Sequence, residues 1–236
     1  LDLGANPDIY PARVDWADPQ RLGFQIESRD QQHLELIEAD LRRGTQRTLL
    51  RERSDTFLNL HDNLHFLPDG DFLWSSERSG FQHLYLYEHD GKLKRQLTSG
   101  DWMVEELLGV DEGKGIAYFS ATKESPLERH AYSVPLAGGA ITKLSTAPGM
   151  HKFVFSDNAA VYIDNWSNET TPPQSEPHSA DGKLLRVLAP NEIKPGHPYY
   201  PYIGAHRPTR YGTLTASDGQ LLHYSLITPA GFDEHK

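Results

Sequence analysis

The chain has 236 residues, with 33 acidic against 23 basic side chains and a formal net charge of −10. This charge disfavours nucleic acid and anionic membranes as partners, because both bind basic surfaces, and no apolar run approaches the roughly 18 residues of a membrane-spanning helix. Cysteine is absent, which excludes disulfides and thiol chemistry and fits a cytoplasmic and a bacterial periplasmic protein equally well. The many prolines, glycines and aromatic residues favour a turn-rich, strand-rich fold.

The first predicted unit covers residues 10–54. Its strands are expected at 12–16, 22–28, 32–38 and 45–51. The letters HLELIEAD at 33–40 return as HLYLYEHD at 83–90. This pair of similar segments indicates an internal repeat.

The second unit, residues 64–98, shows the pattern most clearly. Its strands are expected at 64–67, 72–75, 82–88 and 92–97, with tight turns at 68–70 and 90–91. In the third strand Leu84 and Leu86 should share one face and Tyr85 and Tyr87 the other, because strand side chains alternate. A strand that is apolar on both faces needs cover on both. We therefore predict one blade of a stack.

Two further units complete the repeat. The third, 102–147, has expected strands at 105–109, 116–120, 129–134 and 141–144, and the fourth, 152–188, at 153–155, 160–165 and 184–188. In the fourth unit residues 168–181 are rich in turn formers and are expected to be irregular. The turn aspartates Asp18, Asp69, Asp111 and Asp157 are 51, 42 and 46 residues apart, which suits four-stranded blades of roughly 40–50 residues.

The remaining residues differ in character. Residues 190–210 contain five prolines and are predicted to be a linker, since proline is excluded from central strands. Residues 211–229 are expected to form a β-hairpin around the Asp218-Gly219 turn, and residues 211–236 are expected to be the start of another domain. The predicted fold class is all-β: a partial β-propeller of about four four-stranded antiparallel blades within residues 1–189, then this hairpin as the start of a truncated domain.

Both ends of the chain read as cut edges, because it starts at Leu1 without a signal segment. Propellers close with about four to eight blades, so half of a larger ring is expected. A half ring leaves two blade faces uncovered, and we therefore expect a homo-oligomer.

A family resemblance lies in the second unit. Residues 74–87 read WSSERSGFQHLYLY and are followed by Leu97-Thr98 and Trp102. This stretch, with NLHDNL at 59–64, resembles the N-terminal propeller of the dipeptidyl peptidase IV family, in particular its bacterial branch. The hairpin segment LTASDGQLL at 214–222, continuing to PAGF at 229–232, is similar to the strands that open the family's α/β-hydrolase domain.

The resemblance implies a serine exopeptidase that removes N-terminal X-Pro or X-Ala dipeptides, in which an eight-bladed propeller restricts access to small peptides. This chain would gate and orient the peptide substrate and contact its own hydrolase domain, and no cofactor is implied. No G-x-S-x-G nucleophile elbow occurs in it, so no catalytic residue is assigned and the chain alone should be inactive. A stand-alone propeller scaffold for a protein partner, and a related tripeptidyl or acylaminoacyl peptidase, are the alternatives.

Two sets of candidate site residues lie beside the second unit. Asn59, His61 and Asp62 precede an expected innermost strand and are candidates for the substrate tunnel. Glu77 and Arg78 lie in a loop and are candidates for contact with the hydrolase domain or the substrate. The alternatives are hydrogen bonding at a strand entry for the first set and a loop-fixing ion pair for the second.

The third set is Glu105 and Glu106. The family binds the free amine of its substrate with two adjacent glutamates, and paired carboxylates suit a cation. The family's pair belongs to an earlier blade, however, and neighbours on a strand point to opposite faces. One inward and one exposed carboxylate is therefore expected. No metal site is predicted, because His61 and His65 lack a third ligand.

The tryptophans are given a structural role. Trp16, Trp74 and Trp102 recur near corresponding blade positions and are expected to pack between blades.

Overall fold

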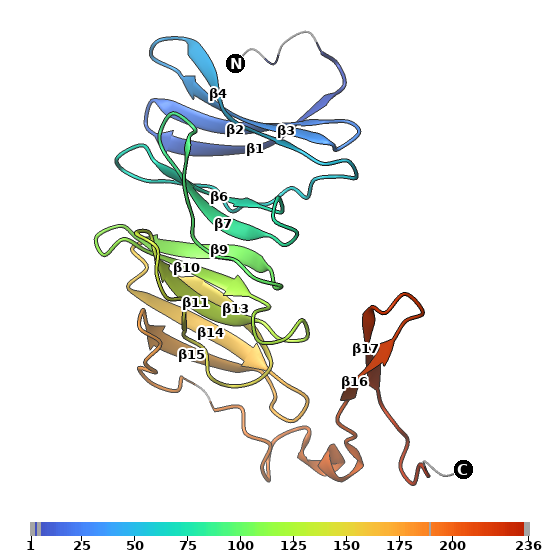
Figure 1. Cartoon of the computed structure of the whole chain (residues 1–236). Coiled ribbons are helices and arrows are strands. Elements are labelled where there is room, and N and C mark those ends of the chain that lie inside the picture. Colours follow the sequence, from blue (N-terminus) through green and yellow to red (C-terminus); the bar gives the residue numbers. More distant parts are fainter. Residues whose placement is uncertain (1–2, 4–5, 189, 234–236) are drawn as a thin grey trace.

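A computed structural model describes residues 3, 6–188 and 190–233, and within these ranges the blades are stacked one on another (Figure 1). Blade one is β1 (Ile9–Asp18), β2 (Arg21–Ser28), β3 (His33–Asp40) and β4 (Thr45–Arg53). Blade two is β5 (His65–Phe66), β6 (Phe72–Ser76), β7 (His83–Tyr87) and β8 (Leu93–Gln96). Blade three is β9 (Val104–Asp111), β10 (Ile116–Ala121), β11 (His130–Pro135) and β12 (Thr142–Lys143). In each blade the strands pair antiparallel in chain order.

Blade four differs from the prediction. It contains β13 (Met150–Phe155), β14 (Val161–Ser167) and β15 (Gln174–Ser179). The third strand thus lies inside the segment expected to be irregular, and residues 184–188 form no strand beyond a single bridge from Leu184 to His178.

The strand β15 contains a proline, Pro177, which the sequence pattern would not place in a strand. The carbonyl of Pro177 accepts from the N–H of Leu185, on the side away from β14. The missing N–H of the proline therefore points to the sheet edge, where proline is tolerated.

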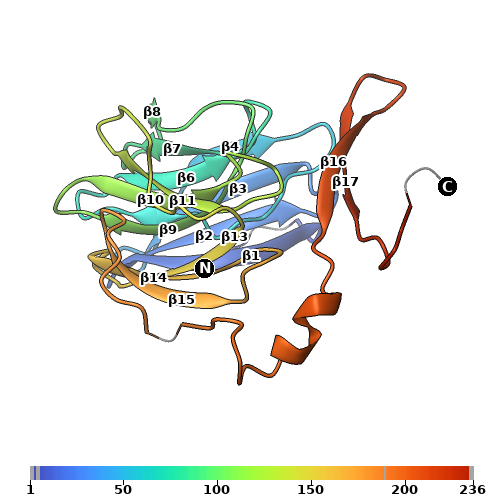
Figure 2. The same cartoon turned by 90° about the horizontal axis from the view of Figure 1, so that it is seen from below.

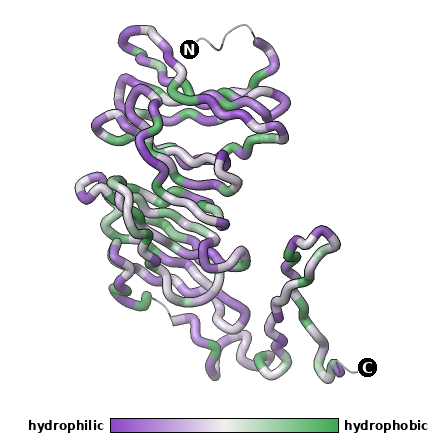
Figure 3. The backbone as a smooth tube through the Cα atoms, in the orientation of Figure 1, coloured by the Kyte–Doolittle hydropathy of each residue, from purple (hydrophilic) through white to green (hydrophobic). Residues whose placement is uncertain are grey.

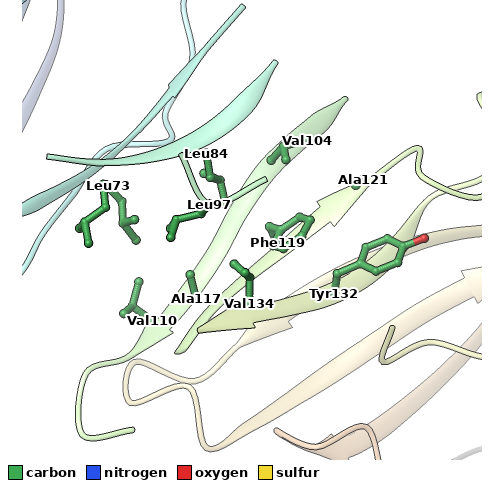
Figure 4. Packing of buried hydrophobic residues seen from close by; sticks show 11 residues of the cluster. Leu73, Leu84, Leu97, Val104, Val110, Ala117, Phe119, Ala121, Tyr132 and Val134 are labelled. Atoms are coloured by element: carbon green, nitrogen blue, oxygen red, sulfur yellow. The ribbon is translucent and has the colours of Figure 1, made fainter. Parts of the chain in front are cut away.

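The two-faced pattern of blade two is confirmed. Leu73, Leu84, Leu86 and Leu97 pack against blade three, with Val110, Phe119 and Val134 among their neighbours (Figure 4). The opposite side packs Phe72, Trp74, Tyr85 and Tyr87 against the leucines of blade one (Leu34, Leu36, Leu49 and Leu50). A third cluster, including Tyr118, Phe153 and Tyr162, joins blades three and four. Each core thus lies between two blades, so each blade depends on a neighbour to bury its apolar side chains.

The turn at Gly91 depends on glycine for two reasons. Its φ is +88°, a region that L side chains rarely adopt. A Cβ at this position would lie 1.8 Å from the backbone oxygen of Leu49. The turn of blade two therefore lies directly against the backbone of blade one.

The tryptophan prediction holds for two of the three residues. Trp74 is fully buried between blades one and two, and Trp102 packs on the core between blades two and three. The prediction is wrong for Trp16, because this side chain is 63% exposed. Gly23 of β2 lies on the face of blade one that approaches Phe66 of blade two. Trp16 pairs with Leu22, the neighbour of Gly23, and therefore lies on the opposite face.

The last described segment leaves the blades. After the 3₁₀ helix η1 (Tyr200–Ala205), β16 (Arg210–Thr215) and β17 (Leu221–Leu226) form a hairpin that stands apart from the stack in Figure 1 and lies to one side of it in the view of Figure 2. Hydrophobic and hydrophilic stretches alternate along this hairpin as they do along the blades (Figure 3). In the part of the chain that is described, no helix is long and apolar enough to cross a membrane.

Candidate functional site

A groove of about 830 Å³ opens where the first strands of blades two, three and four come together. Its lining comes from the segment before β5, from the loop after β6, and from β9, β10 and β13. Six of the seven residues predicted from the sequence line it: Asn59, His61, Asp62, Glu77, Glu105 and Glu106. We call this cavity the inter-blade groove.

The segment before β5 is held by side chains on both sides. Asn59 donates from Nδ2 to both carboxylate oxygens of Glu77, at 3.0 and 3.1 Å. Asp62 pairs with Arg13 of β1. The buried Asn63 donates to the backbone oxygen of Glu105 and accepts from the N–H of Leu107. This amide therefore sets the position of β9 relative to blade two.

His61 serves as a neutral hydrogen-bonding residue. Its Nε2 lies 2.8 Å from the backbone oxygen of Ser75, which can only accept, so Nε2 carries the proton. Its Nδ1 accepts from the N–H of Asn63, and its ring meets Trp74 edge-on at 4.4 Å. Burial lowers the pKa of His61. Because both ring nitrogens already have backbone partners, the ring is a neutral wall of the groove.

The expected alternation fails at Glu105 and Glu106. Ser120 of β10 pairs with Glu106 while the next residue, Ala121, pairs with Val104, so Glu105 is an extra residue in β9. Such a bulge interrupts the alternation of side chains along a strand. Both carboxylates consequently line the groove, where alternation predicted only one.

The two glutamates have different environments. Glu105 forms an ion pair with Arg129, which also lines the groove. Glu106 is exposed and has no hydrogen-bond or ion-pair partner among the residues described. The groove thus holds one neutralised and one free carboxylate, side by side.

Arg78 does not line the groove. It donates to Glu52 of β4 at 2.6 Å and to the hydroxyl of Ser76 at 2.9 Å, and its guanidinium lies 4.8 Å from the ring centre of Tyr85. Glu52 also accepts from the indole of Trp74. Arg78 thus ties blade two to blade one and does not pair with its neighbour Glu77.

Among the groove residues that the sequence analysis did not single out are Gln82, Ser120, Arg129 and His151. His151 is almost fully buried, with Nδ1 at 2.8 Å from the carboxylate of Asp164 and Nε2 at 2.8 Å from the backbone oxygen of Ala147. For His151 the available signal was positional, because residues of successive first strands converge on the axis of a propeller. Gln82, Ser120 and Arg129 lie outside the first strands, and no sequence signal marked them. Across the described ranges, no group of three or more possible ligands could hold a metal ion.

Comparison with known proteins identifies relatives of this architecture. Residues 1–173 match the family model described as "Dipeptidyl peptidase IV (DPP IV) N-terminal region". The human protein Dipeptidyl peptidase 8 is 30% identical over 173 residues, covering 58% of this chain and 19% of its own length. A probable dipeptidyl-aminopeptidase B of Emericella nidulans is 37% identical over 130 residues, covering 52% of this chain and 14% of its own length.

Solved structures agree with the sequence relatives. The crystal structure of dipeptidyl peptidase 4 from Porphyromonas gingivalis superposes with a TM-score of 0.88 at 27% identity, over 99% of this chain and 33% of that one. A putative dipeptidyl aminopeptidase IV from Bacteroides ovatus gives 0.85 at 26% identity, over 100% of this chain and 36% of that one. The chain therefore spans about a fifth or less of these two sequence relatives and about a third of these structures.

Proposed function

Because this chain belongs to the dipeptidyl peptidase IV N-terminal family, we propose that it is the non-catalytic propeller portion of a serine exopeptidase that removes N-terminal X-Pro or X-Ala dipeptides. In this proposal the inter-blade groove gates and orients the peptide, and another part of the same protein cleaves the bond. The relatives are dipeptidyl peptidases, which are hydrolases.

The groove is the observation that carries the orienting role. It brings together segments that lie far apart in the chain, and it presents amide, hydroxyl and carboxylate groups to a space of about 830 Å³. A few convergent polar groups in a concave site are what a ligand needs for orientation. A peptide also offers backbone donors and acceptors that such groups can bind.

The hairpin supports a hydrolase domain as the second partner. Leu214, Leu221 and Ile227 are 61%, 65% and 65% exposed, and apolar surface of this extent favours burial against another unit. We assign residues 190–210 to the linker and residues from 211 onward to the first strands of that domain. Residues 189 and 234–236 of this assignment lie outside the described ranges.

The coding sequence downstream of Lys236 tests the assignment. We expect a G-x-S-x-G elbow followed by an aspartate and then a histidine, the order of the α/β-hydrolase triad. A reading frame without the elbow would overturn the peptidase and leave the protein-binding scaffold in its place.

The reaction type is tested on the whole protein. Chromogenic substrates with a free N-terminal Ala-Pro dipeptide, a tripeptide and an N-acetylated alanine separate the three peptidase classes. We expect the whole protein to release the chromophore from the dipeptide substrate and from neither of the other two. Residues 1–236 by themselves should release it from none of the three. Preferred cleavage of either other substrate would replace the dipeptidyl assignment.

A further inference from the structure

Glu106 is the one carboxylate of the inter-blade groove that has no hydrogen-bond or ion-pair partner in the described part of the chain. The other three acidic side chains of the groove each have a partner: Asp62 has Arg13, Glu77 has Asn59, and Glu105 has Arg129. Glu106 has none. A cation entering the groove would therefore meet this carboxylate without displacing a partner.

Ser120 gives a second, independent indication at the same place. It lies directly opposite Glu106 in the β9–β10 ladder and lines the groove. The residue is only 6% exposed, and its hydroxyl forms no hydrogen bond within the described residues. Buried hydroxyls normally have a partner, so this one is available to a group that occupies the groove.

The β9 bulge explains why the carboxylates of Glu105 and Glu106 face one space. In a regular strand, the alternation of side chains would place the two adjacent carboxylates on opposite faces of β9. With the bulge, Glu105 pairs with Arg129 beside the unpaired Glu106. The result is an acceptor site made of one unpaired carboxylate and one unpaired hydroxyl, next to a carboxylate that is already neutralised.

We propose that Glu106 and Ser120 form a subsite for the side chain of an arginine or lysine in the bound peptide. A guanidinium or ammonium group brings several N–H donors and a positive charge, which match a carboxylate and a hydroxyl acceptor. This inference rests on the proposed peptide-orienting role of the groove. It adds a preference for basic peptides that is separate from the cleaved dipeptide.

Lys152 gives the subsite an internal control. It lines the same groove from β13 and has no ion-pair partner in the described ranges. Its ammonium repels an incoming cation. Removal of this charge by Lys152→Gln should therefore strengthen the binding of a basic peptide, in the opposite direction to changes at Glu106.

The test uses calorimetric titration of the 236-residue chain. The probes are peptides that begin Ala-Pro and carry one arginine at the third, fourth or fifth position, each matched with a peptide in which citrulline replaces arginine. Citrulline keeps the shape and removes the charge. At one position we expect arginine to bind about three- to tenfold more tightly, as a charge-assisted contact in a partly exposed site allows.

Variants then locate the effect. Glu106→Gln should bring the arginine-to-citrulline ratio close to one, and Ser120→Ala should lower it without loss of folding, because no hydrogen bond is removed. Glu192→Gln makes the same change of charge at an exposed linker position that pairs with Lys194, and it should leave the ratio unchanged. A melting curve for each variant reports on folding.

The outcomes separate the two proposals. If no peptide binds, the peptide-orienting role of the groove fails. If arginine and citrulline peptides bind equally at every position, or if Glu106→Gln leaves the preference intact, the basic-residue subsite is wrong while the peptide-orienting role stands.

Discussion

At the residue scale, the same side-chain contact recurs in two blades. The Nδ1 atom of His83 lies 3.0 Å from the hydroxyl of Thr98, and that of His130 lies 2.9 Å from the hydroxyl of Ser145. Each pair is separated by 15 residues. Each hydroxyl also accepts from the backbone N–H that follows the histidine. The contact joins the start of a third strand to the end of a fourth.

The environment of these histidines favours the neutral form. Burial lowers the pKa of both His83 and His130. Trp102 covers the ring of His83 edge-on at 4.9 Å. A neutral imidazole can donate to the backbone oxygen of Gly100 through Nε2 and accept the hydroxyl proton of Thr98 at Nδ1.

Replacement of the Thr98 hydroxyl tests the contact. Thr98→Val keeps the shape but leaves the N–H of Leu84 and Nδ1 of His83 unsatisfied in a buried site. We expect a loss of about 1–3 kcal/mol in the free energy of unfolding, measured by urea denaturation. Thr45→Val, at an exposed position of β4, is the control and should change stability little. Equal stability of both variants would show that the contact does not stabilise the blade.

At the element scale, the strands differ in how much of the fold supports them. The strands β6 and β7 are buried along their whole length and have a neighbouring blade on each face. Within the described residues the strands β16 and β17 pair with each other and with no further strand, and of their residues Gly212 alone is not exposed. An isolated two-stranded hairpin is at best marginally stable in water.

Hydrogen exchange should reveal this difference. In the 236-residue chain, amides of β16 and β17 should exchange orders of magnitude faster than those of β6 and β7, because the hairpin opens without disturbing a blade. Exchange followed by mass spectrometry of the two segments measures this. Comparable protection in both segments would mean that the hairpin is covered in solution.

At the scale of the whole molecule, the face of blade one opposite blade two carries two large exposed apolar side chains. Val14 and Trp16 on β1 are 59% and 63% exposed, and they lie in register with the apolar Phe24 and Leu22 of β2. Blades are normally covered by a neighbour on each face. This face therefore suits contact with another apolar surface.

We predict that the 236-residue chain self-associates through this face. Light scattering should show a mass that rises with concentration, because apolar burial drives the association. Trp16→Glu should shift the equilibrium to the monomer, since a carboxylate is costly to bury. A matched change at the exposed Tyr202 of η1, Tyr202→Glu, should have little effect. A monomer at all concentrations would contradict the prediction.

The sequence alone determined the repeat, the turns and the two faces of the blade strands. Leu84 and Tyr85 point to opposite sides because strand geometry is local and has a period of two residues, and glycine at position 91 marks a turn because few residues tolerate its φ. A local rule suffices wherever the structure depends on neighbouring residues.

The tertiary structure decided the groove and the exceptions. The β9 bulge places Glu105 and Glu106 on one cavity, Pro177 is accommodated at a sheet edge, and Ser120 and His151 come from blades that the sequence separates by tens of residues. Each of these depends on which strands become neighbours. That pairing follows from the summed packing of whole blades, and no local periodicity encodes it.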